Sequence, residues 1–513
     1  MGGDMNKMAC AFGAALLAMP LFSLEADAQT NEYVLHKFKK IQLTNEYWSE
    51  GAAIGDVDGD GKADVIVPPF WYSGPDFKTR HTFYPANNKF AVKNPDGTTK
   101  TVVGFNGGVL SSGERAFADN FLAVVADFNG DGWPDILVGA FANLTPDGKL
   151  PLPAQVPRTL AYWYENPGAE GLRTGADWKR HIVTDEISSE SLQYVDMFGD
   201  GHPVLLGMHE HRVGYFKPDP KDPYNQWTFF PISEKSDEYE WWNHGLGFGD
   251  ITNSGRNDIV YNDGWWKQPD VNDAAHLWKF SPYPFQIGPD QFKLNSYFPN
   301  LKVSWNVDIE DGVADLYHLS TYGGSHMSVY DVNGDGLPDI ITTICAHKFG
   351  LVWWEQLKDR DPMGNILFKR HILIYKKPSD NKYGLLITQM QALAMTDMDG
   401  DGLKDIVTGK HFWAHGNGSE RPFDPDPNAP AVLYWFKLVR SGEGSVDFVP
   451  YLIDDDSGTG NQITIGDVSG HGLPDIVTAN KKGAFVFLHE VAKVTKDEWA
   501  KAQPPVLYPA AKQ

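Results

Sequence analysis

Short apolar runs alternate along the chain with acidic, glycine-rich segments. Runs such as "GAAIGD", "FLAVVAD" and "QITIGD" precede these segments, and "DVIV", "DILV" and "DIVT" follow them. Apolar runs of this length, bounded by glycine and aspartate, are typical of buried strands. Each acidic segment is therefore predicted to be a turn that joins two strands.

The acidic segment is a repeat. Its seven copies begin at Asp56, Asp127, Asp196, Asp250, Asp331, Asp397 and Asp467. Most copies are followed by an aromatic run such as "AYWYENPG", and several by a fourth run such as "DWKRHIVT". Four antiparallel strands repeated around an axis form a β-propeller. The pattern predicts an all-β fold, a seven-bladed β-propeller of four-stranded blades over residues 33–492, followed by a tail at 493–513.

The two ends of the predicted propeller complement each other. The last repeat has only three strand-like runs before the proline-rich tail, whereas "HKFKKIQL" at 36–43 precedes the first repeat as an unassigned run. We expect this N-terminal strand to complete the last blade, because closure removes the open sheet edge of a linear array.

The loops and strands resemble FG-GAP or VCBS repeats, the calcium-loop repeats of integrin α-subunit propellers. The resemblance rests on "DVDGDGKADVIV", "DFNGDGWPDILV", "DVNGDGLPDI" and "DMDGDGLKDIVT" and covers the whole chain after its first residues. It implies the propeller fold and calcium loops, and it leaves the function open.

The loops themselves offer oxygen ligands at positions 1, 3, 5 and 9, with a carbonyl at 7, which suits calcium. An EF-hand would need a glutamate at position 12, where this chain has Val67, Val138, Thr342 and Thr408. We predict structural calcium at about four sites, whose ligands are Asp56, Asp58, Asp60 and Asp64; Asp127, Asn129, Asp131 and Asp135; Asp331, Asn333, Asp335 and Asp339; and Asp397, Asp399, Asp401 and Asp405. The other three loops have lost ligands, at Phe198 and Val204, at Thr252 and Ser254, and at Ser469 and His471.

The net charge limits the possible partners, and the N-terminal segment indicates the cellular compartment. The net charge of −23 argues against nucleic acid and anionic membrane surfaces. Lys7, an apolar run and "ADA" at 26–28 are typical of a signal peptide over 1–28. We expect a secreted or periplasmic protein, monomeric, with no membrane span after signal removal. Cys345 would be the one remaining cysteine, so no intramolecular disulfide is expected.

Departures from the repeat point to a site at the face opposite the calcium loops. The first strand of each repeat starts there and the second ends there, near the axis, so residues at these ends should converge on one funnel. We expect catalytic roles for His244, His326 and His411, and substrate contacts from Glu50, Asn243, Trp265, Trp266, Gln391 and Asn461. His209, His211 and His347 are candidate ligands of zinc or another divalent metal, with His209 and His211 two apart on one strand.

Arg115 and Tyr322 complete the predicted site, and the two tryptophans have two possible roles. Two long insertions should rim the same mouth, bringing Arg115 to a substrate carboxylate and Tyr322 to a proton-transfer step. Trp265 and Trp266 could stack on a sugar or pack between blades. By contrast, His81, His181 and His371 share one outer-strand position and are expected to be structural.

The residues favour two functions of different classes. One is a carbohydrate-active enzyme that works by β-elimination, either a polysaccharide lyase or a keto-sugar dehydratase, with histidines as proton carriers. The "HEH" and "WWNHG" elements are similar to the propeller module of aldos-2-ulose dehydratases, although the chain shows no cupin-like C-terminal region. The alternative is a non-catalytic, integrin-like propeller that binds a glycan or a protein.

Overall fold

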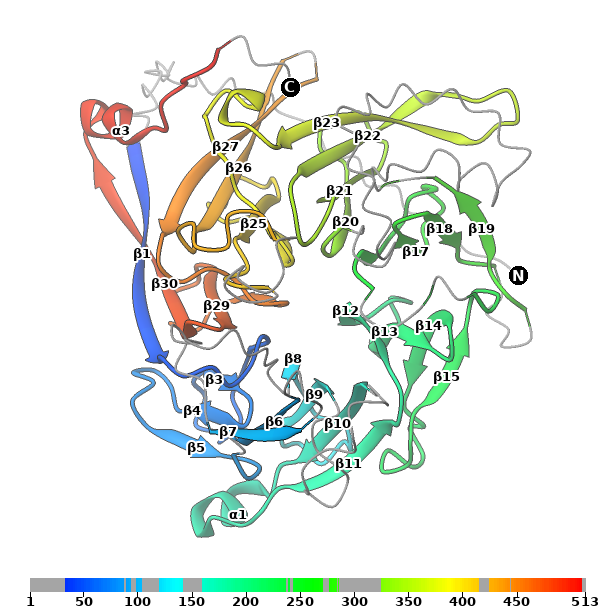
Figure 1. Cartoon of the computed structure of the whole chain (residues 1–513), viewed down its shortest axis with the longest axis vertical. Coiled ribbons are helices and arrows are strands. Elements are labelled where there is room, and N and C mark those ends of the chain that lie inside the picture. Colours follow the sequence, from blue (N-terminus) through cyan, green and yellow to red (C-terminus); the bar gives the residue numbers. More distant parts are fainter. Residues whose placement is uncertain are drawn as a thin grey trace, which may run out of the picture.

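The computed structural model describes residues 33–86, 89–93, 98–103, 120–141, 159–236, 239, 243–270, 276–283, 285, 324–414, 424–442 and 444–509. The chain forms antiparallel sheets that follow one another around a central axis, which is a propeller-like all-β arrangement (Figure 1). Among the described residues there are five four-stranded sheets, one eight-stranded sheet and a two-stranded hairpin.

Each four-stranded sheet follows the predicted order of strand, acidic loop, strand, aromatic strand and outer strand. The first comprises β2 (Ala53–Gly55), β3 (Asp64–Val67), β4 (Phe70–Tyr72) and β5 (Arg80–Thr82). The next two comprise β8 (Asn120–Ala126), β9 (Asp135–Phe141), β10 (Thr159–Glu165) and β11 (Lys179–Thr184), and then β12 (Ser188–Val195), β13 (Val204–His209), β14 (Arg212–Lys217) and β15 (Thr228–Pro231). A further sheet comprises β24 (Leu393–Thr396), β25 (Asp405–Gly409), β26 (Leu433–Ser441) and β27 (Ser445–Asp454). The hairpin is β6 (Lys89–Lys93) with β7 (Thr99–Val103).

The eight-stranded sheet contains two antiparallel runs of four strands. These are β16 (Leu246–Gly249), β17 (Asp258–Tyr261), β18 (Gly264–Lys267) and β19 (Lys279–Pro282), and β20 (Met327–Tyr330), β21 (Asp339–Thr343), β22 (Leu351–Arg360) and β23 (Ile366–Ile374). They join because β16 and β20 pair in parallel, with Gly247 opposite Met327 and Phe248 opposite Ser328. Glycine permits this approach, since a β-carbon at Gly247 would overlap the Met327 carbonyl oxygen. The sheets are therefore not the seven separate ones that the repeats predict.

The N-terminal strand completes the last sheet, as the sequence predicted. β1 (Tyr33–Thr44) pairs with β30 (Gly483–Val494) from Tyr33 opposite Val494 to Thr44 opposite Ala484, and β29 (Asp475–Asn480) and β28 (Ile463–Gly466) follow. The first and last strands thus share one sheet, at the left of Figure 1. β30 continues two residues beyond the predicted boundary at 492 because β1 is long enough to pair with it.

The described tail is not featureless. It contains helix α3 (Lys496–Ala502), which begins where the Thr495 hydroxyl accepts from Glu498 N and the Glu498 carboxylate accepts from Thr495 N, a capping box. The other short helices are α1 (Gly168–Thr174) and the single 3₁₀ turn η2 (Pro378–Asp380). No helix among the described residues is both long and apolar enough to cross a bilayer.

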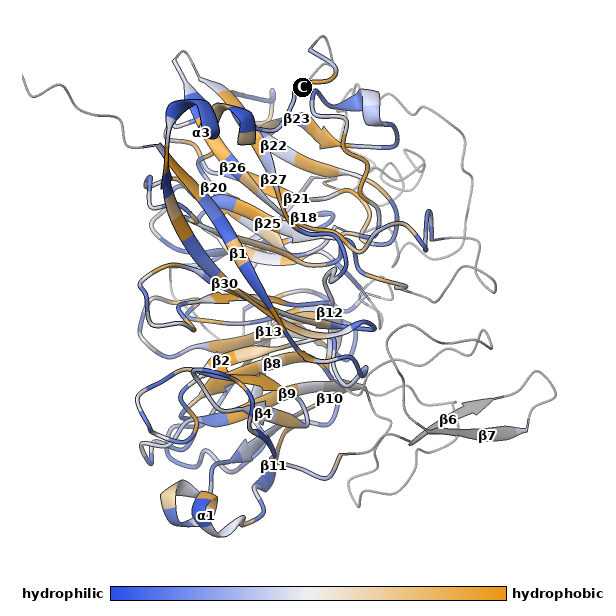
Figure 2. Ribbon diagram, turned by 90° about the vertical axis from the view of Figure 1, so that its left-hand side faces the viewer, coloured by the Kyte–Doolittle hydropathy of each residue, from blue (hydrophilic) through white to orange (hydrophobic). Residues whose placement is uncertain are grey.

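The core lies between neighbouring sheets. One cluster, for example, joins Leu137 and Trp163 of one sheet to Leu205 and Phe216 of the next. Figure 2 shows the corresponding pattern, with apolar strands in the body of the ring and polar turns at its surface. Packing between sheets fixes their inner ends around the axis, where the candidate site lies.

Candidate functional site

One position of the repeat supplies most of the polar side chains near the axis. It lies six residues before the first aspartate of each acidic loop, at or just before the start of the innermost strand, and holds Glu50, Glu190, His244, Ser325, Gln391 and Asn461 in six of the seven repeats. In the remaining repeat it holds Phe121, and a register shift between Asn120 and Leu122 places Asn120 beside it. The acidic loops follow the other end of these strands, so the two sets of residues lie on opposite faces.

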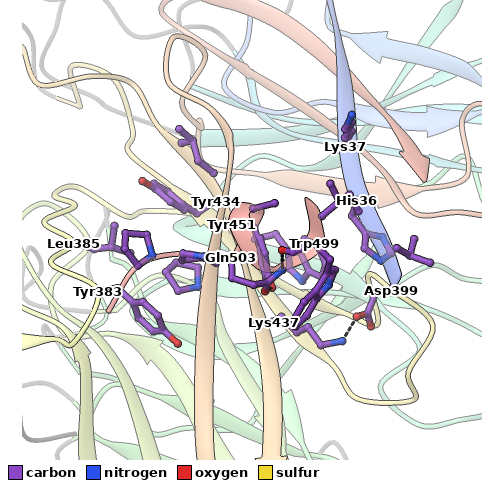
Figure 3. A pocket seen from close by; sticks show the side chains of 18 residues that line it. His36, Lys37, Tyr383, Leu385, Asp399, Tyr434, Lys437, Tyr451, Trp499 and Gln503 are labelled. Carbon is purple, nitrogen blue, oxygen red and sulfur yellow. Dashed lines mark hydrogen bonds and ion pairs between the residues drawn. The ribbon is translucent and has the colours of Figure 1, made fainter. Parts of the chain in front are cut away.

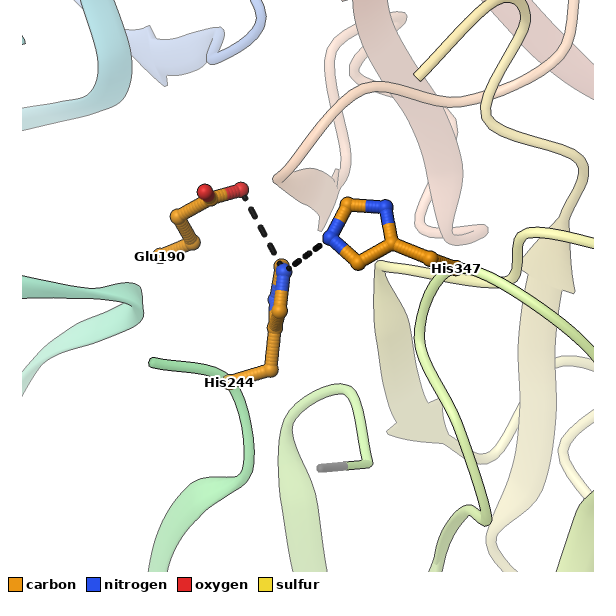
Figure 4. Close-up of side chains that lie close together, drawn as sticks. All are labelled: Glu190, His244 and His347. Atoms are coloured by element: carbon orange, nitrogen blue, oxygen red, sulfur yellow. Dashed lines mark hydrogen bonds and ion pairs between the residues drawn. The ribbon is translucent and has the colours of Figure 1, made fainter. Parts of the chain in front are cut away.

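Hydrogen bonds connect these side chains into one buried chain. His244 and His347 approach through their Nε2 atoms at 2.8 Å, with the Glu190 carboxylate beside them (Figure 4). Gln391 Nε2 donates to His347 Nδ1 at 2.9 Å, and the other end of the same amide accepts from His411 Nδ1. One glutamine therefore bridges two histidines through their Nδ1 atoms. The chain continues to a carboxylate at each end, and its members, here called the axial network, are Glu190, His244, His347, Gln391, His411, Glu50 and Lys481.

Glu50 forms the ionised end of the axial network. Lys481 Nζ lies 2.7 Å from Glu50 Oε1, His411 Nε2 lies 3.4 Å from the same oxygen, and the Tyr47 hydroxyl also donates to it. Burial alone would raise the pKa of the Glu50 carboxyl, but the charges of Lys481 and His411 outweigh it and hold that pKa well below its usual range. Glu50 is consequently a carboxylate at neutral pH.

Glu190 forms the opposite, protonated end. Its Oε2 lies 3.5 Å from His244 Nε2 and accepts from Asn461 Nδ2 at 3.2 Å. Burial and the nearby charge of Glu50 raise the pKa of the Glu190 carboxyl to about 8, against the smaller opposing effects of Asn461 and Lys481. Two carboxyls at the ends of one chain of polar contacts thus hold opposite protonation states at pH 7.

The same three groups at one end could also hold a metal ion. Ligand atoms of Glu190, His244 and His347 lie within 4.8 Å of one another, and this two-histidine, one-carboxylate donor set suits zinc and related divalent metals. The site can therefore either transfer protons or bind a divalent cation.

The structure brings together six of the residues singled out from the sequence: Glu50, His244, His347, Gln391, His411 and Asn461. Sequence reasoning missed Glu190 and Lys481, although both left a signal. Glu190 precedes Asp196 by the same six residues that separate Glu50 from Asp56, and Lys481 follows Asp467 at the same distance as His411 follows Asp397. Reading every repeat in register would have found them.

Two other predicted residues lie beside the axial network without joining it. Asn243 is buried, its carbonyl accepts from Glu190 N at 2.8 Å, and its Nδ2 contacts Met208 Sδ at 3.6 Å. His326 has no hydrogen-bond partner at Nδ1 among the described residues, and burial lowers the pKa of its imidazole to about 4, despite a backbone hydrogen bond at Leu192. His326 is therefore neutral at physiological pH.

His209 and His211 are not a chelating pair on one strand. His209 is the last residue of β13 and pairs with Arg212, so Glu210 and His211 form the two-residue turn between β13 and β14, both with positive φ (45° and 62°). His209 Nδ1 lies 2.9 Å from the Glu186 carbonyl oxygen. Among the described residues, His347 clusters with Glu190 and His244 instead of with these two histidines.

The two predicted stacking tryptophans belong to the core. Trp265 and Trp266 are 3% and 2% exposed, and they pack on Phe368 and Tyr261 respectively, in separate clusters between sheets. They occupy the aromatic third strand of the repeat, whose side chains fill the space between sheets, so they do not line the funnel. Arg115 and Tyr322 fall outside the described residues.

The outer-strand histidines have the structural role that the repeat predicted. His81, His181 and His371 stack on Trp71, Trp163 and Trp353, with ring centroids 4.0, 4.2 and 4.1 Å apart. The ring nitrogens of the latter two also contact Glu165 and Glu355, at 2.7 and 2.6 Å.

The acidic loops have a shape that fits calcium. Asp56 accepts from Asp60 N and Gly61 N at 3.1 and 2.9 Å, which curls the loop around its own carboxylates, and the same bonds recur at Asp127, Asp331 and Asp397. The ninth residue, Asp64, accepts from Val57 N and Gly74 N, and burial raises its pKa to about 6. Carboxylate oxygens of Asp56, Asp58 and Asp64 lie within 4.8 Å of one another, an all-oxygen set of the kind calcium prefers.

Comparison with known proteins agrees with the resemblance of the loops. Residues 120–149 match the model of the FG-GAP repeat, so the chain contains an FG-GAP repeat there. No curated protein sequence matches the chain.

The comparison with solved structures found matches of low similarity. An Agrocybe aegerita lectin, described as recognising non-reducing terminal N-acetylglucosamine, is 13% identical with a TM-score of 0.36, over 82% of this chain and 81% of the lectin. The rhamnogalacturonan lyase YesW and a Bacillus licheniformis rhamnogalacturonan lyase are each 13% identical with TM-scores of 0.35, over 88% of this chain and 75% of theirs.

Proposed function

We propose that this protein is an exported, calcium-stabilised β-propeller of seven blades that acts on carbohydrate, catalysing β-elimination at the axial network. The five four-stranded sheets and the two halves of the eight-stranded sheet together make seven blades. Each half of that sheet has its own acidic loop, and the halves join only where two residue pairs of β16 and β20 meet.

One observation carries the proposal: Glu190 and Glu50 lie at the two ends of one chain of polar contacts, in environments that push their pKa values in opposite directions. Sites arranged in this way supply an acid and a base at the same pH.

β-Elimination needs a base and an acid, and both can be assigned at the Glu190 end of the network. A base removes the proton next to a carbonyl or carboxylate, the electron pair forms a carbon–carbon double bond, and the carbon–oxygen bond to the leaving group breaks. We assign the base to the His244–His347 pair and the acid that protonates the leaving oxygen to Glu190. Glu190 and His347 suit contact with substrate, because their side chains are less completely enclosed than that of His244.

Gln391 and the ionised Glu50 then fix the protonation states of the histidines between them. Gln391 fixes His347 through Nδ1, and His411 is held between Gln391 and the Glu50 carboxylate. Lys481 compensates the negative charge of Glu50 and so favours the ionised form of that carboxylate. The predicted roles of Arg115 and Tyr322, a carboxylate contact and a proton donor on the insertions, complement these groups.

A divalent metal such as zinc is a second candidate occupant of the cluster of Glu190, His244 and His347, favoured by their convergence within 4.8 Å. Such an ion would supply charge stabilisation for the enolate-like intermediate. A non-catalytic glycan-binding propeller is the alternative for the whole protein. The 1–3% exposure of Glu50, Gln391 and His411 favours it, since groups this enclosed can also serve only to hold the blades together.

The test is a screen of the mature protein against uronate polymers and keto-sugars, following the absorbance of an unsaturated product. We expect turnover that Glu190→Gln lowers by roughly 10²–10⁴-fold, the range for a general acid. His181→Ala, which removes a stacked structural histidine, is the control and should leave turnover per folded molecule unchanged. Glycan binding without any unsaturated product would support the binding alternative instead.

Two further measurements test the rest of the proposal. Metal analysis after EDTA washing, repeated for His244→Ala, shows whether the cluster retains a divalent metal. N-terminal sequencing of the protein recovered outside the cytoplasm should begin at Gln29; a retained start at Met1 would contradict export by signal cleavage.

A further inference from the structure

One position of the third strand lies beside the acidic loop in every repeat. In six repeats it directly precedes the residue whose backbone N–H donates to the last loop aspartate, as Gly74 N does to Asp64 Oδ1 at 2.9 Å and Leu438 N to Asp405 Oδ1 at 2.8 Å. The strand registers locate the same position in the other repeats. It holds Ser73, Glu165, Lys217, Lys267, Glu355, Lys437 and Leu488.

Lysine occupies this position in two of the loops that have lost ligands. In the loop that begins at Asp196, Phe198 and Val204 replace oxygen donors, and Lys217 Nζ lies 3.8 Å from the remaining Asp200 Oδ2. In the loop that begins at Asp250, the position holds Lys267. A lysine at this position thus accompanies two of the three loops that lack some calcium ligands.

Lys437 is the exception, because it faces a loop with a complete ligand set. Its Nζ bonds to Asp399 Oδ2 (Figure 3). It also lies 2.9 Å from Asp401 Oδ2, so it contacts the third and fifth loop positions. The ammonium therefore lies against two of the carboxylates that would bind calcium in this loop.

The other complete loops have no cation at this position. Ser73 is neutral, and Glu165 and Glu355 are acids that accompany loops with asparagine at the third place. Asn333 Nδ2 donates to Glu355 Oε1 at 3.3 Å, which links the acid directly to its loop. In these three loops the neighbour leaves the negative charge of the ligand set intact or adds to it.

We propose that the Lys437 ammonium closes the loop that begins at Asp397 in place of calcium, so that calcium binds the loops that begin at Asp56, Asp127 and Asp331. Calcium would be held by the same carboxylates of Asp399 and Asp401 that Lys437 contacts, and two cations at one carboxylate repel each other. Carboxylate oxygens of Asp397, Asp399 and Asp405 lie within 4.8 Å of one another, and Lys437 contacts this cluster through Asp399. This inference rests on the proposal that the complete loops bind calcium.

The experiment counts calcium bound to the mature protein by native mass spectrometry after EDTA treatment and calcium titration. Lys437→Ser, which installs the residue found at Ser73, should bind one calcium more than the wild type. Ser73→Lys is the reciprocal change and should bind one fewer. Lys358→Ser is the matched control: Lys358 Nζ lies 3.8 Å from Asp335 but is 75% exposed, so the count should not change.

The outcomes separate this inference from the proposal beneath it. An unchanged count in Lys437→Ser, or four calcium ions at the complete loops of the wild type, overturns the lysine closure alone. Binding of no calcium by any variant overturns both. If Lys437→Ser does not fold, Ser73→Lys decides the question by itself. Loss of one calcium ion in Ser73→Lys supports the lysine closure, and an unchanged number of ions overturns it.

Discussion

His244 Nε2 and His347 Nε2 lie 2.8 Å apart, although the two residues come from the start of β16 and the segment after β21. At this distance one nitrogen donates and the other accepts. Since Gln391 Nε2 donates to His347 Nδ1, a neutral His347 carries its proton on Nε2 and donates it to His244. The lone pair of His347 therefore faces Gln391, which leaves Nε2 of His244 as the basic atom of the pair, so Gln391 determines which of the two rings can accept a proton.

Replacing Gln391 with leucine tests this positioning role. The two Nδ1 groups it bridges would lose their partner, at a cost of about 1–3 kcal/mol for each unsatisfied buried group. We expect a lower melting temperature together with a shifted pH profile and a drop of roughly tenfold in turnover, less than loss of the general acid itself.

Gln356→Leu is the matched control for that experiment. Gln356 is equally buried, at 2% exposure, but its Nε2 donates to the carbonyls of Ile251 and Pro338, beside the acidic loops. It should lose similar stability and keep its turnover and pH profile. Equal catalytic effects in both variants would show that Gln391 acts only through stability.

The sequence predicted the fold well because its signals are local. Apolar runs, acidic turns and the missing fourth strand of the last repeat each occupy a few consecutive residues, and β1 pairs with β30 as expected. The joining of two units into one sheet was not predictable, because it depends on the close parallel approach of Gly247 and Met327, far apart in the chain.

The site was predicted less completely because its contacts join different repeats. The position that holds His244 could be read from the sequence, whereas its contact with Glu190, on β12, depends on how two sheets face each other. The prediction for Trp265 was wrong because the aromatic side chains of the third strands pack between sheets. The prediction for His211 was wrong because the strand ends at His209.

Glu50→Gln should destabilise the protein in a pH-dependent way. Lys481 would be left buried without its counter-charge, which costs about 3–5 kcal/mol. The folded-state pKa of Glu50 lies below its ordinary value of 4.5, so ionised Glu50 contributes stability above pH 4.5 that is lost as the pH falls below it. Denaturant unfolding of wild type and variant should therefore differ most near pH 7 and converge in acid.

The control for that series is Glu170→Gln on helix α1. Glu170 pairs with Arg173, but both side chains are more than two-thirds exposed, at 75% and 71%. Its removal should change the unfolding free energy by less than about 0.5 kcal/mol at any pH. A gap between wild type and Glu50→Gln that stays constant from pH 7 to pH 3 would contradict the ionised state of Glu50.

Calcium should stabilise the fold through the complete loops. Asp335→Asn removes a charged ligand at the fifth loop position, and the calcium-dependent gain in stability should shrink accordingly. A single site at a hundredfold excess over its dissociation constant contributes about 2.7 kcal/mol. Asp200→Asn alters the same position in a depleted loop and serves as control. Melting curves with calcium and with EDTA make the comparison, and an equal loss in both variants would count against the loop at Asp331 as a calcium site.

Closure of the ring by the N-terminal strand predicts a contrast between two paired strands. Ile41 of β1 lies opposite Val486 and packs against the core between the last and first sheets, whereas Val491 of β30 is 50% exposed. Ile41→Lys places an ammonium against that core and removes apolar contacts, so we expect a loss of about 2–4 kcal/mol in the free energy of unfolding. Val491→Lys should stay within about 0.5 kcal/mol of the wild type, because its side chain already faces water. Equilibrium denaturation of both variants measures the difference. Equal stability would mean that β1 adds an edge strand without closing the ring, and the open edge should then show itself as concentration-dependent association.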